Sequence, residues 1–215
     1  MKHATIRICT NELDFSDLPN IKPDWSKSIY GDVKEIIPED KTEPLGKWVT
    51  LTHFVDANLM HDILTGRSVT GILHLLNKTP INFFSKKQAT VETATYGSKF
   101  VAARTCVEQI IELRLMLRYL GVPIREQSYM FGDNDSVVSS STRVEGKLHK
   151  RHQILSFHRV REAVASGMVS FNFIPGSINP ADILSKHWAY ASVWPMLKPL
   201  LFYDWNPEPD HFQEE

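Results

Sequence analysis

WVTLTHFVD, at residues 48–56, is a run of β-branched and aromatic residues that predicts a β-strand ending in an aspartate. A second run of this kind, SVTGILHLL, occupies residues 68–76. Residues 77–80, NKTP, then favour a tight reversal into a third strand, INFFS at residues 81–85. Three strands joined by connections this short predict an antiparallel meander.

The period of the apolar residues changes after this meander. From Phe100 to Leu120 they recur at helical spacing, and Gly121 with Pro123 is a typical helix end. The remaining elements predicted from the pattern are a strand at 128–133, a short helix at 135–141, a helix at 149–166, a strand at 168–175 and a helix at 179–188. Helical crossovers require parallel pairing among the first, fourth and fifth strands. The sequence therefore predicts an α/β domain whose mixed five-stranded sheet, three antiparallel strands and then two parallel ones, is flanked by helices.

The two ends of the chain lack this regularity. Residues 1–46 contain four prolines and little periodicity, which favours a linker or extended arm with Trp25 and Tyr30 as docking points. Residues 204–215 are acidic and contain two prolines, so we expect this tail to fray. The regular part between them, residues 47–203, is the expected domain.

Composition and charge narrow the class of protein. Hydrophobic residues make up 42% and charged residues 23%, as in ordinary globular proteins, and the formal net charge is −1. No apolar stretch reaches the roughly 20 residues that cross a bilayer, so we expect no membrane partner. The sequence contains no HExxH, GxSxG, P-loop or GxGxxG motif. A basic segment at residues 147–161 could face phosphates or could be a solvated helix face.

Three aspartates are the candidates for chemistry. Asp56 follows the apolar residues of the first strand, Asp133 ends the fourth strand, and Asp182 opens the helix after the fifth. Ligands of such sheets lie near strand ends, where these acids are expected to meet. Clustered carboxylates repel one another and hold divalent cations, with Mg²⁺ or Mn²⁺ favoured by oxygen ligands. Each acid alone also has an ordinary explanation, as a turn residue or as the acid at a helix N-terminus.

Four stretches together resemble a known family. FVDANLMHD, SKKQATVETATYGSKF, FGDNDSVV and NPADILSKHW occur in the order and spacing of the ribonuclease H region at the C-terminal end of copia-type (Ty1/copia) retrotransposon polyproteins. The amino-acid sequence is most similar to elements of this type in diatoms and oomycetes. The resemblance implies that residues 1–46 follow a reverse transcriptase domain, which would be a partner of this chain. It also implies an intracellular location, in cytoplasmic virus-like particles or in the nucleus.

The family implies a ribonuclease H-like fold and a site of four carboxylates. Such a site binds two Mg²⁺ (or Mn²⁺) ions and hydrolyses the RNA strand of an RNA–DNA hybrid during retrotransposition. Asp56, Asp133 and Asp182 match three of its catalytic, metal-binding acids. The fourth is a Glu at the start of the long helix, and in GSKF that position is held by Lys99.

Lys99 is a departure that bears on activity. An ammonium group offers positive charge but no lone pair to a metal, and it could pair with Asp56 or Asp133 in place of a cation. The nearest acid, Glu92, lies seven residues earlier, outside the predicted helix. We therefore expect catalysis to be abolished or reduced by several orders of magnitude.

The resemblance also implies nucleic-acid contacts. The residues expected to contact a hybrid are Lys86, Lys87, Asn134, Lys150, Arg151 and His152. Three hypotheses stay open: a ribonuclease H impaired by Lys99, a catalytically inactive nucleic-acid-binding module from a decayed or repurposed element, and a purely structural domain of a polyprotein.

Overall fold

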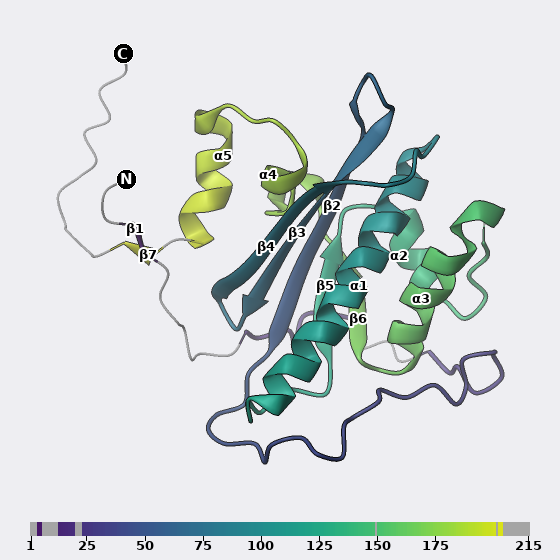
Figure 1. The fold of residues 1–215 in the computed structure, drawn as a ribbon, viewed down its shortest axis with the longest axis vertical. Coiled ribbons are helices and arrows are strands. Elements are labelled where there is room, and N and C mark those ends of the chain that lie inside the picture. Colours follow the sequence, from purple (N-terminus) through teal and green to yellow (C-terminus); the bar gives the residue numbers. More distant parts are fainter. Residues whose placement is uncertain (1–3, 6–12, 20–22, 149, 201, 204–215) are drawn as a thin grey trace.

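The computed structural model describes residues 4–5, 13–19, 23–148, 150–200 and 202–203. A five-stranded sheet with the order β4-β3-β2-β5-β6 is its centre (Figure 1). Antiparallel pairing joins β2 to β3 and β3 to β4, whereas β2–β5 and β5–β6 are parallel. The strands are β2 (Leu51–Asp62), β3 (Arg67–Leu76), β4 (Thr79–Lys87), β5 (Ser128–Gly132) and β6 (Val169–Phe173). The predicted mixed sheet is confirmed.

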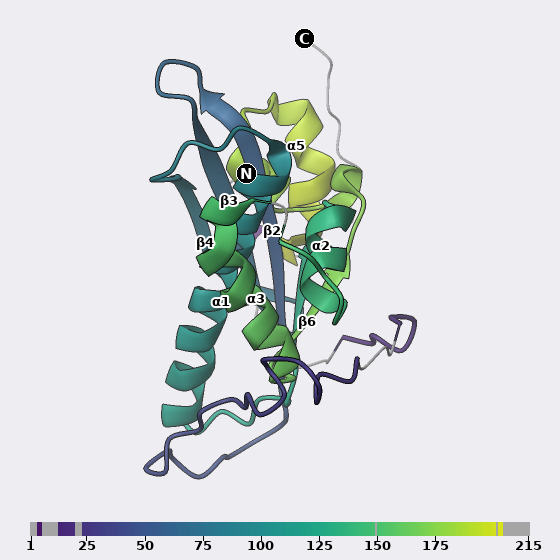
Figure 2. The ribbon, with the colours of Figure 1, turned by 90° about the vertical axis from the view of Figure 1, so that its right-hand side faces the viewer.

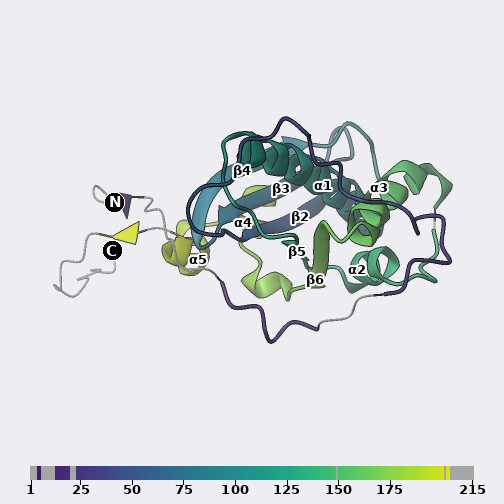
Figure 3. The ribbon, with the colours of Figure 1, turned by 90° about the horizontal axis from the view of Figure 1, so that it is seen from below.

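Helices cover both faces of this sheet (Figure 3). The helices are α1 (Thr95–Tyr119), α2 (Asp135–Thr142), α3 (Ile154–Ala165), α4 (Asp182–Ser185) and α5 (Tyr190–Leu197). Short 3₁₀ turns are η1 (Arg151–Gln153), η2 (Gly176–Ile178) and η3 (Lys198–Leu200). A two-residue strand pair, β1 (Ala4–Thr5) with β7 (Phe202–Tyr203), completes the described elements.

Several predicted boundaries were wrong. The long helix begins at Thr95 instead of Phe100, so Lys99 lies inside it. Strand β2 continues to Asp62, which makes Asp56 a mid-strand residue instead of its last one. The helix expected at 179–188 is only Asp182–Ser185, because the backbone of Lys186 is already extended at φ −123°. Helix α5 had no predicted counterpart.

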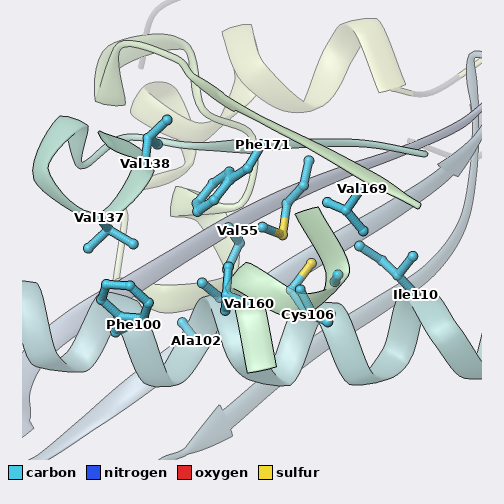
Figure 4. Close-up of a cluster of buried hydrophobic side chains, with 14 of the residues drawn as sticks. Val55, Phe100, Ala102, Cys106, Ile110, Val137, Val138, Val160, Val169 and Phe171 are labelled. Carbon is cyan, nitrogen blue, oxygen red and sulfur yellow. The ribbon is translucent and has the colours of Figure 1, made fainter. Parts of the chain in front are cut away.

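The main core lies between α1, α3 and the sheet. Phe100, Cys106 and Ile110 project from α1 onto Val55 and Phe171, and all are at most 5% exposed (Figure 4). Burial raises the pKa of the Cys106 thiol, which behaves as a small apolar side chain. Because α1 is held along this whole face, its first turns have a fixed place beside β2 and β5.

The N-terminal arm crosses the far end of this core. Residues 13–19 and 23–46 contain no helix or strand, yet Trp25 and Tyr30 are each only 7% exposed. The guanidinium of Arg161, on α3, lies 4.7 Å from the Trp25 ring and 5.3 Å from the Tyr30 ring. Figure 2 shows the arm passing below α3 and the last turns of α1. The expected tail at 204–215 lies outside the described residues.

Candidate active site

The sheet and α4 bring the predicted acids together. Asp56 is buried in the middle of β2, opposite Gly71 of β3, and Asp133 directly follows β5. Gly71 is needed for close approach, since an added Cβ would lie 2.6 Å from the Ala181 carbonyl oxygen. Helix α4, which begins at Asp182, therefore packs tightly on β3 and places its acid beside Asp56.

Asn179 fixes the chain just before α4. Its side-chain Nδ2 donates to the Val55 carbonyl on β2 at 3.1 Å, and its Oδ1 accepts from the Ala181 backbone N–H at 3.1 Å. The residue is fully buried, so both contacts form away from water. Sequence reasoning missed this role, although Asn-Pro before a helix is a typical signal for a side chain that organises a turn.

Lys99 occupies the space between two of the acids. Its Nζ donates to Asp56 Oδ1 at 2.8 Å and also to Asp133 Oδ1. The lysine side chain is only 12% exposed and that of Asp56 is fully buried. Burial lowers the pKa of Lys99, but the charges of Asp56 and Asp133 outweigh it and raise that pKa above its ordinary value. The ammonium is therefore a fixed charge at the centre of the site.

The other oxygen of Asp56 and the carboxylate of Asp182 have partners of their own. Ser185 Oγ donates to Asp56 Oδ2, and Lys186 Nζ donates to Asp182 Oδ1. Burial raises the pKa of Asp56, but the adjacent Lys99 charge and the hydrogen bonds from Lys99 and Ser185 hold that pKa below its ordinary value. The pKa of Asp182 is raised, because burial and the Asp56 charge outweigh Lys186. Ser185 and Lys186 were missed, although they lie three and four residues after Asp182, the spacing at which side chains of a predicted helix meet.

The residues as they stand do not fit a pair of divalent ions. The hollow between Asp56, Lys99, Asp133 and Asn134 has a volume of about 10 Å³, enough for about one water molecule. A bound metal needs oxygen lone pairs at the position that the ammonium holds. Within the described residues, no three His, Cys, Asp or Glu side chains are grouped to hold a metal. Lys99 thus supplies the positive charge that the carboxylates require.

Glu92 does not replace the missing acid. Its side chain is buried in the loop before α1 and accepts from His152 Nε2 at 3.0 Å. Its Oε2 also lies 2.4 Å from where a Cβ on Gly97 would be, so it packs against the backbone of α1. This carboxylate is engaged away from Asp56.

The predicted nucleic-acid contacts fall into two groups. Lys86 and Lys87 are exposed at the end of β4, where Lys87 pairs with Asp62 at 2.8 Å. Lys150, Arg151 and His152 precede α3; Lys150 donates to Thr93 at 2.8 Å, in the same loop as Glu92. Asn134 lines the hollow instead, and its Oδ1 accepts from the Val137 N–H at 3.0 Å as the cap of α2. The loop from β4 to α1 connects the two basic groups.

Sheet order, a central strand with a buried acid, and a following helix that carries another acid define a ribonuclease H-like α/β fold. No known protein-family profile matches the chain. It is similar to the Retrovirus-related Pol polyprotein from transposon TNT 1-94 of Nicotiana tabacum, with 28% identity over 136 residues. That match covers 63% of this chain and 10% of the polyprotein.

Solved structures agree with the fold. The N-terminal RNase H domain of rv2228c from Mycobacterium tuberculosis, solved as a fusion with maltose binding protein, has a TM-score of 0.50 at 10% identity. That likeness covers 70% of this chain and 97% of the other. LC11-RNase H1, solved in complex with an RNA/DNA hybrid, has a TM-score of 0.50 at 15% identity and covers 63% and 93%. Within the described ranges, no helix combines the length and apolar content that crossing a bilayer demands.

Proposed function

We propose that this chain is a ribonuclease H-type domain of a copia-type polyprotein that binds RNA–DNA hybrids but hydrolyses them very slowly or not at all. The observation that carries the proposal is the position of Lys99 Nζ, bonded to both Asp56 and Asp133. A lysine cannot donate an electron pair to a metal while it is protonated, and its raised pKa keeps it protonated. Water activation by metal, the usual source of rate in such sites, is then lost.

Hybrid binding rests on separate features. Recognition of the phosphate backbone of a hybrid needs exposed cations. Lys86 and Arg151 supply them near the end of the sheet where α1 begins. Ribonuclease H-like folds recognise duplex shape and 2′-OH groups more than base sequence. The hybrid in the complex with LC11-RNase H1 is a ligand of that protein, and we extend it to this chain as part of the proposal. A reverse transcriptase domain would be the neighbour in the polyprotein, inside cytoplasmic particles or the nucleus.

Metal-dependent hydrolysis is the second candidate, with Mg²⁺ or Mn²⁺ as the cofactor. The observation that favours it is the convergence of Asp56, Asp133 and Asp182, since a single substitution separates this set from four carboxylates. The two candidates differ in whether the natural chain cleaves the hybrid and in the effect of an acid at position 99.

The test compares hydrolysis of a labelled RNA–DNA hybrid by the natural chain, by Lys99→Glu and by Lys99→Gln, each with Mg²⁺ and with EDTA. We expect no Mg²⁺-dependent cleavage by the natural chain and a gain of several orders of magnitude in Lys99→Glu. Lys99→Gln is the matched control, because it removes the ammonium without adding a carboxylate, and should stay inactive. Equal, robust cleavage by the natural chain and Lys99→Glu would contradict the proposal.

Binding is measured separately, as fluorescence anisotropy of the same hybrid. The natural chain and Lys99→Gln should bind alike. Lys86→Glu and Arg151→Glu should each weaken binding and reduce the salt dependence by about one counterion per lost phosphate contact. If neither charge reversal changes the affinity for the hybrid or its salt dependence, the hybrid is held elsewhere or not at all.

A further inference from the structure

The tip of β2 departs from regular pairing with β3. Asn58 pairs with Val69 and Asp62 with Arg67, so three residues of β2 lie opposite one residue of β3. Met60, inside this bulge, has a positive φ of 51°, which is unfavourable for a residue with a side chain. Bulges of this kind change the direction in which side chains point, and His61 lies within this one.

His61 meets a second histidine from a distant part of the chain. Its Nε2 lies 3.0 Å from Nε2 of His187, which follows α4. The ring centroids are 4.5 Å apart and the ring planes differ by 44°, so the rings are tilted and meet through their nitrogens. His61 is partly buried and His187 is exposed, so solvent has access to the pair.

We propose that His61 and His187 form a binding site for a divalent transition-metal ion such as Zn²⁺. Two imidazole nitrogens on a tetrahedral Zn²⁺, each at about 2.0–2.1 Å, are about 3.3 Å apart. The observed 3.0 Å is within a few tenths of an ångström of that spacing. Neutral imidazoles suit Zn²⁺, Cu²⁺ and Ni²⁺ and not Mg²⁺, so this site is chemically separate from the carboxylates.

Asn58 supplies the partner that a metal-bound histidine needs. Its Nδ2 donates to His61 Nδ1 at 2.9 Å. A half-turn of the amide presents Oδ1 instead, which accepts the proton that Nδ1 carries when Nε2 binds a metal. Asn58 is the last residue of β2 in regular register before the bulge, so its position is set by the sheet.

The metal would join the tip of β2 to the segment after α4. In the described residues no third His, Cys, Asp or Glu joins this pair, so water completes the coordination. The segment includes Lys186, which pairs with Asp182, and Trp188, whose Nε1 donates to the Asp182 carbonyl at 3.2 Å. Bound Zn²⁺ therefore stabilises the part of the fold that carries Asp182, by linkage to the folded state.

The experiment titrates the full chain with Zn²⁺ by calorimetry and measures the shift in melting temperature between Zn²⁺ and EDTA. We expect saturable binding and a rise in melting temperature. His61→Gln and His187→Gln should each weaken binding at least about tenfold, since even outer partners of metal ligands contribute that much. His187→Cys should retain binding, because a thiolate also binds Zn²⁺.

His152→Gln is the matched control, since His152 is also exposed and hydrogen-bonded but lies near Glu92. It should bind Zn²⁺ as the natural chain does. The proposal is overturned if the natural chain does not bind Zn²⁺, if either glutamine variant binds as tightly, or if His187→Cys binds no better than His187→Gln. The readout is independent of hybrid cleavage, so failure here leaves the proposed function untouched.

Discussion

Helix α1, which runs along the sheet (Figure 1), holds buried cations against carboxylates towards both of its ends, in opposite proportions. Near its start, one ammonium, Lys99, faces two carboxylates, Asp56 and Asp133. Near its end, two guanidiniums, Arg114 and Arg118, face the single carboxylate of Glu35 at 2.7 and 2.9 Å. The first cluster has an excess of acceptors and the second an excess of donors.

The excess donors at one end and the excess acceptors at the other have different surroundings. Arg114 has partners for its remaining N–H groups within the protein: it donates to the Glu126 carbonyl and to Ser128 Oγ, each at 2.8 Å. The carboxylates around Lys99 instead line a small hollow. Buried charge alone therefore does not mark a ligand site; what distinguishes the two ends is whether polar atoms face a space that a ligand could enter.

Arg114→Ala should give the largest loss of stability. The guanidinium is 1% exposed, and its removal leaves Glu35 with Arg118 as its remaining donor and leaves Ser128 Oγ and the Glu126 carbonyl without this donor. Breaking a buried ion pair in this way costs about 3–5 kcal/mol of unfolding free energy. Urea unfolding measures it, and Mg²⁺ should not restore the loss, since only one carboxylate lies there. A cost under about 1 kcal/mol would mean that the arm does not dock through Glu35 in solution.

Lys99→Ala is the same truncation at the other end of the helix. In EDTA it should lower the free energy of unfolding less than Arg114→Ala does, and the stability of this variant should depend on Mg²⁺. Asp56 and Asp133 lose their shared cation, but Asp56 keeps the hydrogen bond from Ser185 and the hollow beside both carboxylates has room for water, so we expect about 2–3 kcal/mol. Mg²⁺ should recover part of this loss by binding the freed carboxylates. The natural chain should show no such shift. Identical stability of Lys99→Ala in EDTA and in Mg²⁺ would remove the distinction between the two ends.

The sheet and the acids were predictable because their signals are local. Strand and helix periods appear within each segment, and right-handed crossovers with short connections leave few ways to order the strands. Parallel pairing of the first and fourth strands brings Asp56 beside Asp133, although Asp56 lies in mid-strand and not at a strand end, and Lys99 contacts both acids. The early start of α1 was missed because apolar periodicity begins only at Phe100.

The contacts that could not be predicted join segments far apart in sequence. Glu35 and Arg114 are 79 residues apart, and His61 and His187 are 126 apart. No repeating pattern encodes such pairs, because each depends on how a loop without regular structure crosses the folded core. The role of Ser185 was partly predictable, because its spacing from Asp182 is helical. Its contact with Asp56 was not, because that contact depends on the position of α4 on β3.

The smallest expected effect is a pH dependence of the Glu35 cluster. Burial raises the pKa of Glu35, but Arg114 and Arg118 outweigh it and hold that pKa below its ordinary 4.5. In the unfolded chain the carboxyl takes up a proton first, so its stabilising contribution is complete above pH 4.5 and is lost as pH falls through the folded pKa.

Glu35→Gln is the reference, because every other titrating group is shared. The difference in unfolding free energy between the two chains should be constant from neutral pH to about 5 and shrink below 4.5. A difference that is unchanged in acid would show that the arginines do not hold Glu35 ionised, and the two ends of α1 would then differ in partners but not in charge.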